Sequence, residues 1–563
     1  MNKKERRASG AHYTTEKNIL KVIEPLFLDD LRAEFTRLKP RRDTGRANAL
    51  RTFQSKLGGL RFFDPACGCG NFLIIAYREL RVLEIEVLRE INPRGQREIL
   101  DVATLSQIDV DQFFGIEIAE FPARIAEVAL WMMDHIMNNR LSLEFGEAYA
   151  RIPLKTSPHI CCADALETDW NDVLLAEKCS FVFGNPPFIG FVMRGVHQKD
   201  QAAGLMKRLG ASGSRLDYVA AWFLKAGEYI QNSRAKIGFV ATNSITQGEQ
   251  VAQLWPALFQ QYRLDIWFAH RIFAWGSDAR GQAHVHCVIL GLSRRDNISQ
   301  ERRLFSYQAY DADPDETRHR ALSPYLFDAT SLGNPHLVVE RTRAPRVDIP
   351  GIRVGSKPVD GGYFIMDSAS RTKFIQDEPG AASLIRPFVG TAEYINGGER
   401  WILTLHGVPP QKLRAMPKVM NAIERVRLYR LGKLPSRKDP NGKNNVPSAL
   451  SLGLAETPSE FHVTVIPDRP FLVIPEVSSE RREYLPIAWL EPPTVPSNKL
   501  LIAASVELFQ FAIITSRMHM AWTIFVGGRL ESRYQYSPGI NYNPFPWPDI
   551  TEPTKGKLNK LVL

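Results

Sequence analysis

The sequence predicts an α/β fold with a doubly wound, mostly parallel sheet, followed by a C-terminal mixed α+β domain. Four short apolar runs, at residues 60–63, 113–116, 159–163 and 181–184, are typical of buried strands. The first is followed by helical periodicity from residue 71 to about residue 90, and each run ends at an acid, a glycine-rich turn or a polar turn. Because such sheets bind ligands at the carboxyl ends of their strands, the residues after these runs are candidate site residues.

The first predicted strand leads into the turn Asp64-Pro65-Ala66-Cys67-Gly68-Cys69-Gly70. Its glycines let the backbone approach a ligand closely, and the N-terminus of the following helix favours negative charge. The turn departs from the G-x-G-x-x-G dinucleotide fingerprint, because residue 73 is leucine. On its own it is therefore weak evidence for a particular ligand.

The second and third predicted strands lead to carboxylates. Glu117 closes the second strand, where an acid can hold a ribose diol, and Asp164 follows the third. An ordinary exposed acid before a helix is the alternative for Glu117, and a helix N-cap is the alternative for Asp164.

The fourth predicted strand ends in Asn185-Pro186-Pro187-Phe188. Two consecutive prolines fix φ and remove two backbone donors, so this turn exposes carbonyl oxygens rather than N–H groups. Asn185 adds a side-chain acceptor and Phe188 adds a flat face. Two acceptors and a stacking surface suit a planar ring that carries an exocyclic amino group, such as adenine.

With these motifs in this order, the chain resembles the S-adenosylmethionine-dependent amino-methyltransferases that act on adenine in DNA, in their γ arrangement. More narrowly, it resembles the methyltransferase and target-recognition portion of Mme-type (type IIL) restriction–modification enzymes. The stretches that carry the resemblance are residues 10–14, 64–72, 184–190, 279–285, 475–482 and 528–534. The resemblance implies a Rossmann-like class I methyltransferase sheet, in which strands at 235–242, 264–269 and 284–292 complete the sheet and the last two form an antiparallel hairpin at its edge.

The resemblance also implies roles for individual residues. The catalytic motif is Asn185, Pro186, Pro187 and Phe188. The residues expected around S-adenosylmethionine are Tyr13 and Thr14 near the methionine, Asp64, Ala66, Gly68 and Phe72 at its amino-acid end, Glu117 on the ribose, Ile118 against the adenine, and Asp164 as acceptor for the cofactor's amino group.

The chemistry of the target base limits which methylation reactions fit these residues. The amino nitrogen of adenine is a poor nucleophile, so catalysis would consist mainly of positioning and electrostatics on a base flipped out of the duplex. C5-cytosine methylation needs a thiolate, usually in a Pro-Cys pair, and the sequence contains no Pro-Cys dipeptide. N4-cytosine methylation, RNA adenine methylation, protein-glutamine methylation and a non-catalytic DNA-binding module stay open as alternatives.

Composition bounds the protein class. The 563 residues are too many for one ordinary core, and 44% of them are hydrophobic, as in globular proteins. The sequence has neither an apolar run of about 18 residues nor a secretory signal, which favours a cytoplasmic protein without a membrane partner. Its six cysteines do not have the spacing of a structural zinc site, so we expect no metal and reduced thiols.

The net charge of +10 is concentrated in one segment. Residues 411–443 contain ten basic and two acidic side chains, or 10 − 2 = +8, which favours a polyanion partner. The resemblance implies that this partner is double-stranded DNA. A second basic stretch, expected as a loop over the DNA, spans residues 190–215. The predicted DNA-binding residues are Arg425, Arg427, Arg430, Arg437 and Lys438 in the first segment, and Arg194, Lys207 and Arg208 in the second.

Landmarks along the chain divide it into three parts. We expect a catalytic domain over residues 1–335 and a target-recognition domain over 352–498. A C-terminal helix is expected at 499–520, apart from one β-branched stretch, with an aromatic, proline-rich tail that packs back onto the protein. Mme-type enzymes carry an endonuclease domain ahead of the methyltransferase, whereas only nine residues precede Gly10. The nuclease is therefore absent, on another chain as a defence-system partner, or trimmed away.

Overall fold

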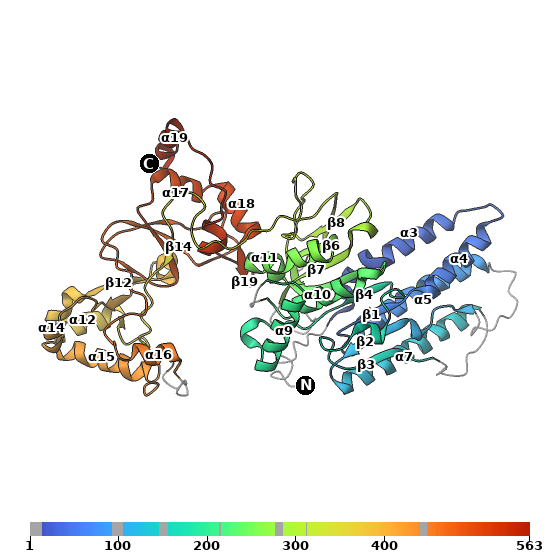
Figure 1. The fold of residues 1–563 in the computed structure, drawn as a ribbon, viewed down its shortest axis with the longest axis horizontal. Coiled ribbons are helices and arrows are strands. Elements are labelled where there is room, and N and C mark those ends of the chain that lie inside the picture. Colours follow the sequence, from blue (N-terminus) through green and yellow to red (C-terminus); the bar gives the residue numbers. More distant parts are fainter. Residues whose placement is uncertain are drawn as a thin grey trace. The chain divides into compact units, whose positions relative to one another are not determined.

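The computed structural model describes residues 14–92, 105–145, 156–212, 216–275, 285–310, 312–437, 439 and 447–562. The chain divides into two compact units, Met1–Val339 and Glu340–Leu563. Figure 1 draws the first unit in blue to yellow-green and the second in yellow to red. None of the described helices is both long and apolar enough to cross a bilayer.

Within the described residues, the first unit contains a nine-stranded sheet in the order β3-β2-β1-β4-β5-β7-β6-β8-β9. The strands from β3 to β5 are parallel, β7 is antiparallel to β5, and β6 is antiparallel to β7. This confirms the doubly wound, mostly parallel sheet and its antiparallel hairpin. The strands are β1 (Phe62–Asp64), β2 (Phe113–Glu117), β3 (His159–Cys162), β4 (Phe181–Gly184), β5 (Lys236–Thr242), β6 (Leu264–Trp275), β7 (Val285–Arg294), β8 (Arg302–Ser306) and β9 (Asp315–His319).

Two adjacent phenylalanines of β1 show how the sheet is covered. Side chains alternate along a strand, so Phe62 and Phe63 point to opposite faces. Phe62 packs against Phe27 within the core formed with α2 to α5 and α7, whereas Phe63 packs edge to face against Trp170 of α8 and near Tyr229 of α10. The helices are α2 (Glu16–Ile23), α3 (Asp29–Leu38), α4 (Arg46–Gly59), α5 (Asn71–Ile91), α7 (Glu120–Phe145), α8 (Trp170–Val173), α9 (Val196–Arg208), α10 (Ala220–Tyr229) and α11 (Gly248–Pro256).

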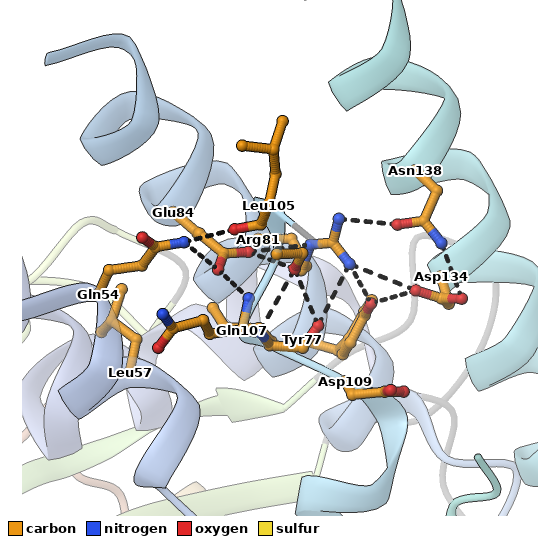
Figure 2. A network of polar contacts seen from close by, with 12 residues as sticks. Gln54, Leu57, Tyr77, Arg81, Glu84, Leu105, Gln107, Asp109, Asp134 and Asn138 are labelled. Atoms are coloured by element: carbon orange, nitrogen blue, oxygen red, sulfur yellow. Dashed lines mark hydrogen bonds and ion pairs between the residues drawn. The ribbon is translucent and has the colours of Figure 1, made fainter. Parts of the chain in front are cut away.

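A buried network of polar side chains joins α5 to α7 (Figure 2). Arg81 on α5 is 1% exposed, and its guanidinium lies 3.4 Å from the Glu84 carboxylate and 3.3 Å from that of Asp134 on α7. The Tyr77 hydroxyl donates to Asp134 over 2.5 Å, and Asn138 accepts from Arg81 over 2.8 Å. Because α5 and α7 begin just after β1 and β2, the network fixes the two helices that follow the first two candidate ligand loops.

The second unit consists of small sheets and short helices. Its sheets have the strand orders β10-β18-β14-β16, β11-β13-β12-β17 and β15-β20-β19. The strands are β10 (Arg353–Val354), β11 (Ile365–Met366), β12 (Ile385–Val389), β13 (Trp401–Leu403), β14 (Phe471–Pro475), β15 (Val477–Ser478), β16 (Ala488–Leu490), β17 (Val495–Pro496), β18 (Leu500–Ala504), β19 (Gly528–Leu530) and β20 (Arg533–Gln535). The helices are α12 (Ser368–Asp377), α13 (Thr391–Asn396), α14 (Pro410–Arg414), α15 (Pro417–Arg430), α16 (Ala449–Leu454), α17 (Leu508–Ile514), α18 (Arg517–Val526) and α19 (Glu552–Val562). This mixture of elements confirms the α+β class.

The prediction of a helix over residues 499–520 is wrong at its start. Residues 500–504 form β18, which pairs with β14 and β10, and helices begin only at Leu508. A short continuous apolar run fits a buried strand as well as a buried helix, and here strand pairing decides. The aromatic tail does pack back, because Tyr536 and Tyr542 are each 1% exposed. Residues after 499 thus share a sheet with residues before it, while the domain boundaries expected from the sequence stay predictions.

Candidate active site

The candidate residues follow four neighbouring strands of the first unit. Strands β3, β2, β1 and β4 are adjacent and parallel, so Asp164, Glu117, Asp64 and Asn185 follow their carboxyl ends along one edge of the sheet. The backbone N–H of Cys67 donates to the carbonyl of Ile116, which joins the loop after β1 to β2. The predicted convergence of these residues at one edge is therefore present in the structure.

Asp64 closes β1 and is 1% exposed. Its Oδ1 accepts from the Ala66 N–H over 3.0 Å, which fixes the carboxylate at the start of the loop. The loop ends at Gly70 with φ +81°, where a β-carbon would lie 2.9 Å from that of Ala126 on α7. Glycine at 70 thus permits both the left-handed turn and the close approach of the loop to α7.

Glu117 closes β2 and holds the same loop from the other side. Its Oε2 accepts from the Gly68 N–H over 3.1 Å, and its Oε1 accepts from the Ala119 N–H over 2.9 Å. Next to it, the side chain of Ile118 is 69% exposed, which is unusual for isoleucine and leaves an apolar surface beside the carboxylate.

Burial changes the acidity of both carboxyl groups. Burial, with the charge of Glu117 as a lesser cause, raises the pKa of Asp64 to about 8, against the opposing hydrogen bond from Ala66. Burial likewise raises the pKa of Glu117, although backbone N–H groups of Ala119 and Gly68 oppose it. Positive charge placed beside either carboxyl group would lower its pKa and favour its ionised form.

Asp164 lies in the loop after β3. Its Oδ1 accepts from the Leu166 N–H over 2.8 Å, and its Oδ2 accepts from the side-chain amide of Gln201 over 2.8 Å. The loop itself is held from α10, where the Lys225 ammonium donates to the carbonyls of Ala165 and Thr168.

Asn185 begins the turn after β4. Its Nδ2 donates to the Thr14 hydroxyl over 3.4 Å, while its Oδ1 is buried and has no hydrogen-bond partner among the described residues. Buried acceptors in folded proteins are nearly always paired, so this oxygen, beside a candidate ligand loop, is available to a donor from a ligand. Phe188 is partly buried and packs against the core of the first unit.

The other predicted cofactor residues divide into two groups. Ala66 and Gly68 use their N–H groups to hold Asp64 and Glu117. Phe72 is 4% exposed, and its ring lies 6.1 Å from that of Phe183, so its side chain belongs to the core. Tyr13 lies outside the described residues. Within those residues, no three His, Cys, Asp or Glu side chains are grouped as metal ligands would be.

Known proteins with similar sequences and structures identify the family to which this chain belongs. Residues 40–306 match the DNA-methyltransferase domain of MmeI, and residues 333–549 match the MmeI target recognition domain. A solved structure of the type IIL restriction–modification enzyme MmeI in complex with DNA matches 100% of this chain, at a TM-score of 0.89 and 45% identity. The chain belongs to the MmeI family. This confirms the resemblance identified from the sequence motifs.

The match covers only part of each relative. The chain covers 71% of the MmeI chain in that structure. DNA methyltransferase A of Bacillus subtilis (strain 168) is 35% identical over 559 residues, which is 98% of this chain and 59% of that protein. The chain therefore spans about three fifths of the length of this relative.

In this member of the MmeI family, the basic stretch after the Asn-Pro-Pro-Phe motif is largely helical rather than a loop. It contains α9, in which Lys207 and Arg208 are exposed and Arg208 pairs with Glu228 over 3.0 Å. Arg194 is 5% exposed and donates to the backbone carbonyls of Ile189 and Leu216. The prediction that Arg194 contacts DNA is therefore wrong, because its guanidinium is used inside the protein.

Arg430 is the second correction among the predicted DNA contacts. It is 0% exposed, and its guanidinium donates five hydrogen bonds to backbone carbonyls, those of Pro358, Val359, Leu454, Thr457 and Glu460. All five of its N–H groups are thus used within the second unit. Arg425, Arg427 and Arg437 are exposed and remain candidates for the DNA face, and Lys438 lies outside the described residues.

Several residues that contact the site carry no signal in the sequence. Gln201 contacts Asp164, the Tyr218 hydroxyl donates to Gln201, and the indole N–H of Trp222 donates to the Pro65 carbonyl over 3.2 Å. None of the three lies in a motif, and only the fold brings them to the strand ends.

Proposed function

We propose that the protein is a site-specific DNA methyltransferase that transfers a methyl group from S-adenosylmethionine to N6 of an adenine flipped out of duplex DNA. The observation that carries the proposal is the buried, unpaired Oδ1 of Asn185 at the start of the Asn-Pro-Pro-Phe turn. An exocyclic amino group has two N–H donors, one for this oxygen and one for the Pro186 carbonyl.

The acids at the strand ends fit S-adenosylmethionine. The buried Asp64 carboxyl suits its ammonium group, Glu117 suits its ribose hydroxyls, and Asp164 suits its adenine amino group, with Ile118 against the ring. When bound, this cofactor supplies a methyl group on a positively charged sulfur, so the protein needs no covalent intermediate. The site contains the acceptors that such a ligand requires.

The chain's own residues would act on the target base. By accepting both amino hydrogens, Asn185 and Pro186 would hold N6 near tetrahedral geometry and stabilise the positive charge that develops on it during attack. The adjacent prolines keep the two acceptors in fixed positions. Phe188 would stack on the base, which cannot reach the sheet edge while it is paired in the duplex.

The second unit would recognise the DNA sequence, since it matches the target recognition domain of the family. Its exposed arginines Arg425, Arg427 and Arg437, with Lys207 and Arg208 in the first unit, are the proposed phosphate or base contacts. We place the activity in a restriction–modification or related defence context, on DNA in the cytoplasm.

Product identification tests the proposal. The purified chain is incubated with methyl-labelled S-adenosylmethionine and, separately, duplex DNA, RNA or cell protein, and the products are digested and separated. We expect label in N6-methyladenine from duplex DNA. Label in N4-methylcytosine would overturn the base assignment, label only in RNA or protein would overturn the substrate class, and an absence of label from every substrate would overturn the enzymatic assignment.

A further inference from the structure

Gln201 on α9 contacts the candidate cofactor site through all polar atoms of its side chain. Its amide nitrogen donates to Asp164 Oδ2 over 2.8 Å and to Glu167 Oε1 over 3.0 Å. Its amide oxygen accepts from the Tyr218 hydroxyl over 2.8 Å. Two N–H groups and one carbonyl are what a glutamine amide offers, so each has a defined partner.

These contacts fix the rotation of the Asp164 carboxylate. The backbone of the loop is held independently, because Lys225 and the Trp170 indole donate to its carbonyls. The carboxylate accepts from Leu166 on one oxygen and from Gln201 on the other. A carboxylate offers about four acceptor positions, so one on each oxygen is left for a ligand, in a direction that Gln201 determines.

On the side away from Asp164, contacts through Tyr218 join Gln201 to the Asp64 loop and to the Asn-Pro-Pro-Phe turn. Burial raises the pKa of Tyr218 to about 12, further above neutral pH than the ordinary value, so its hydroxyl is protonated and can donate. The Tyr218 ring packs edge to face on Trp222, whose indole holds the Pro65 carbonyl beside Asp64. The Arg194 guanidinium lies 5.4 Å from the Tyr218 ring and holds the carbonyl of Ile189, the residue after Phe188. Gln201 therefore connects the Asp164 loop to the Asp64 loop and to the Asn-Pro-Pro-Phe turn.

We propose that Gln201 is a positioning residue that orients the Asp164 carboxylate toward the 6-amino group of the cofactor's adenine, and so makes the site select a 6-amino purine. The inference rests on the proposed function, which supplies the cofactor. An ionised carboxylate only accepts hydrogen bonds, so it favours an amino group at this position and not a 6-oxo group. Because Gln201 fixes the direction of the carboxylate, a 6-oxo purine cannot avoid this unfavourable contact, and the site binds the 6-amino purine more tightly.

The test compares two product-type ligands on the full chain by titration calorimetry. S-adenosylhomocysteine carries the 6-amino group, and S-inosylhomocysteine carries a 6-oxo group in its place. Gln201→Leu removes the contacts at similar volume, and Tyr218→Phe removes only the hydroxyl while keeping the ring. Ala203→Leu is the matched control, since it adds a leucine at an exposed position of the same helix.

We expect Gln201→Leu to weaken S-adenosylhomocysteine about tenfold and Tyr218→Phe about threefold, as for a lost hydrogen bond, with less than a twofold change for S-inosylhomocysteine. The control should change neither. Equal weakening of both ligands by Gln201→Leu, or no weakening of either, would overturn the proposal. If the unsubstituted chain failed to bind S-adenosylhomocysteine, the cofactor assignment itself would be at fault, which is a separate result.

Discussion

The carboxylate of Asp64 lies against the backbone of Gly184, the residue before Asn185. Gly184 has φ +150°, and a β-carbon at this position would lie 2.3 Å from Asp64 Oδ1. The acid proposed to bind the cofactor therefore lies against the residue that precedes the turn proposed to bind the target base. In methyl transfer a misplacement of about 1 Å between donor and acceptor can cost about a hundredfold in rate, so in the proposed function this contact between two neighbouring strands would help to align the two groups.

Gly184→Ala should therefore impair cofactor binding and catalysis together. The added methyl group must displace the buried Asp64 carboxylate, whose atoms are the three nearest to it, and the positive φ adds strain for any residue other than glycine. We expect affinity for S-adenosylhomocysteine to fall by roughly 1–3 kcal/mol, as for a charge-assisted hydrogen bond that is lost. Gly59→Ala is the control, since a β-carbon there meets no atom within 4 Å. Unchanged affinity in Gly184→Ala would mean that Asp64 does not hold the cofactor.

Asn185→Ala should separate catalysis from cofactor binding. The side-chain oxygen is unpaired, and its proposed partner is the target base and not the cofactor, so affinity for S-adenosylhomocysteine should stay near that of the unsubstituted chain. Loss of one acceptor that stabilises developing charge should cost about 3 kcal/mol of barrier, or roughly a hundredfold in kcat. Single-turnover methylation of duplex DNA measures this, with Asn232→Ala at an exposed residue as control. Methylation at the normal rate would contradict the N6 assignment.

Binding of the cofactor should release protons at neutral pH. Burial raises the pKa of Asp64 to about 8 in the free protein, so most of its carboxyl groups are protonated at pH 7. A bound ammonium group favours the ionised form and lowers that pKa, which expels the proton. Affinity for S-adenosylhomocysteine should rise from about pH 6 to about pH 8, where the ligand's α-amino group begins to lose its own proton.

Calorimetry in buffers of different ionisation enthalpy measures the released proton. Asp64→Asn should bind more weakly and lose most of this pH dependence. The stability of the fold should change with pH in the opposite direction to the ligand affinity. The pKa of the Asp64 carboxyl is raised from 3.8 to about 8 in the folded protein, so its contribution to stability is complete below pH 3.8 and is lost as the pH rises through 8. The melting temperature of the free protein should thus fall more between pH 6 and 8 than that of Asp64→Asn. Parallel curves would indicate that Asp64 is ionised throughout.

Much of the candidate site could be predicted because its signals are local. Each strand is a short apolar run, and the acid or turn that ends it is adjacent in the sequence, so Asp64, Glu117, Asp164 and Asn185 could be placed at one sheet edge before the structure was known. Gln201 could not, because it is a polar residue in a polar helix, and its partner Asp164 is 37 residues away. A contact of this kind depends on how α9 packs against the Asp164 loop, and no periodic pattern in the sequence reveals it.

Arg430 shows a signal that was present but easily missed. The buried residues of α15 are Val419, Ala422, Ile423, Val426 and Arg430, with the spacing of one helix face. Arg430 continues this apolar stripe, whereas Arg425 and Arg427 lie off it and are exposed. Charge alone placed all three on the DNA face, but helical position distinguishes the buried arginine from the others.

The buried network of α5 and α7 should be essential for stability. Arg81→Met leaves Glu84 and Asp134 buried without their cation, which should reduce the free energy of unfolding by about 3–5 kcal/mol. Arg89→Met is a matched control, because Arg89 also joins α5 to α7, through Glu144, but its side chain is 45% exposed. An exposed pair contributes about 0–1 kcal/mol. Urea denaturation measures both variants, and equal effects would show that the network is not a special constraint.

The arginines of the second unit should separate into structural and DNA-binding residues. Arg430→Gln removes the buried guanidinium that donates to five backbone carbonyls, so it should destabilise the second unit by several kcal/mol and reduce DNA binding only through loss of folded protein. Arg425→Gln and Arg437→Gln should leave the melting temperature nearly unchanged. If they contact phosphates, each should flatten the dependence of log Kd on log salt by about one unit for every DNA sequence.

An arginine that reaches a base edge would behave differently. Contacts to bases determine which DNA sequence is recognised, whereas contacts to phosphates determine how the protein is placed on the duplex. Its loss should relax the choice of base at one position of the recognised site, most often a guanine, with a cost of about 1–3 kcal/mol for the preferred sequence. Sequencing of methylated genomic DNA from a host that expresses each variant distinguishes the two cases.

Replacing residues 352–498 by those of a relative should change the methylated site while the chemistry is preserved. An unchanged site would place recognition elsewhere, in α9 or in the C-terminal segment, and would remove Arg425 and Arg437 from the reading surface.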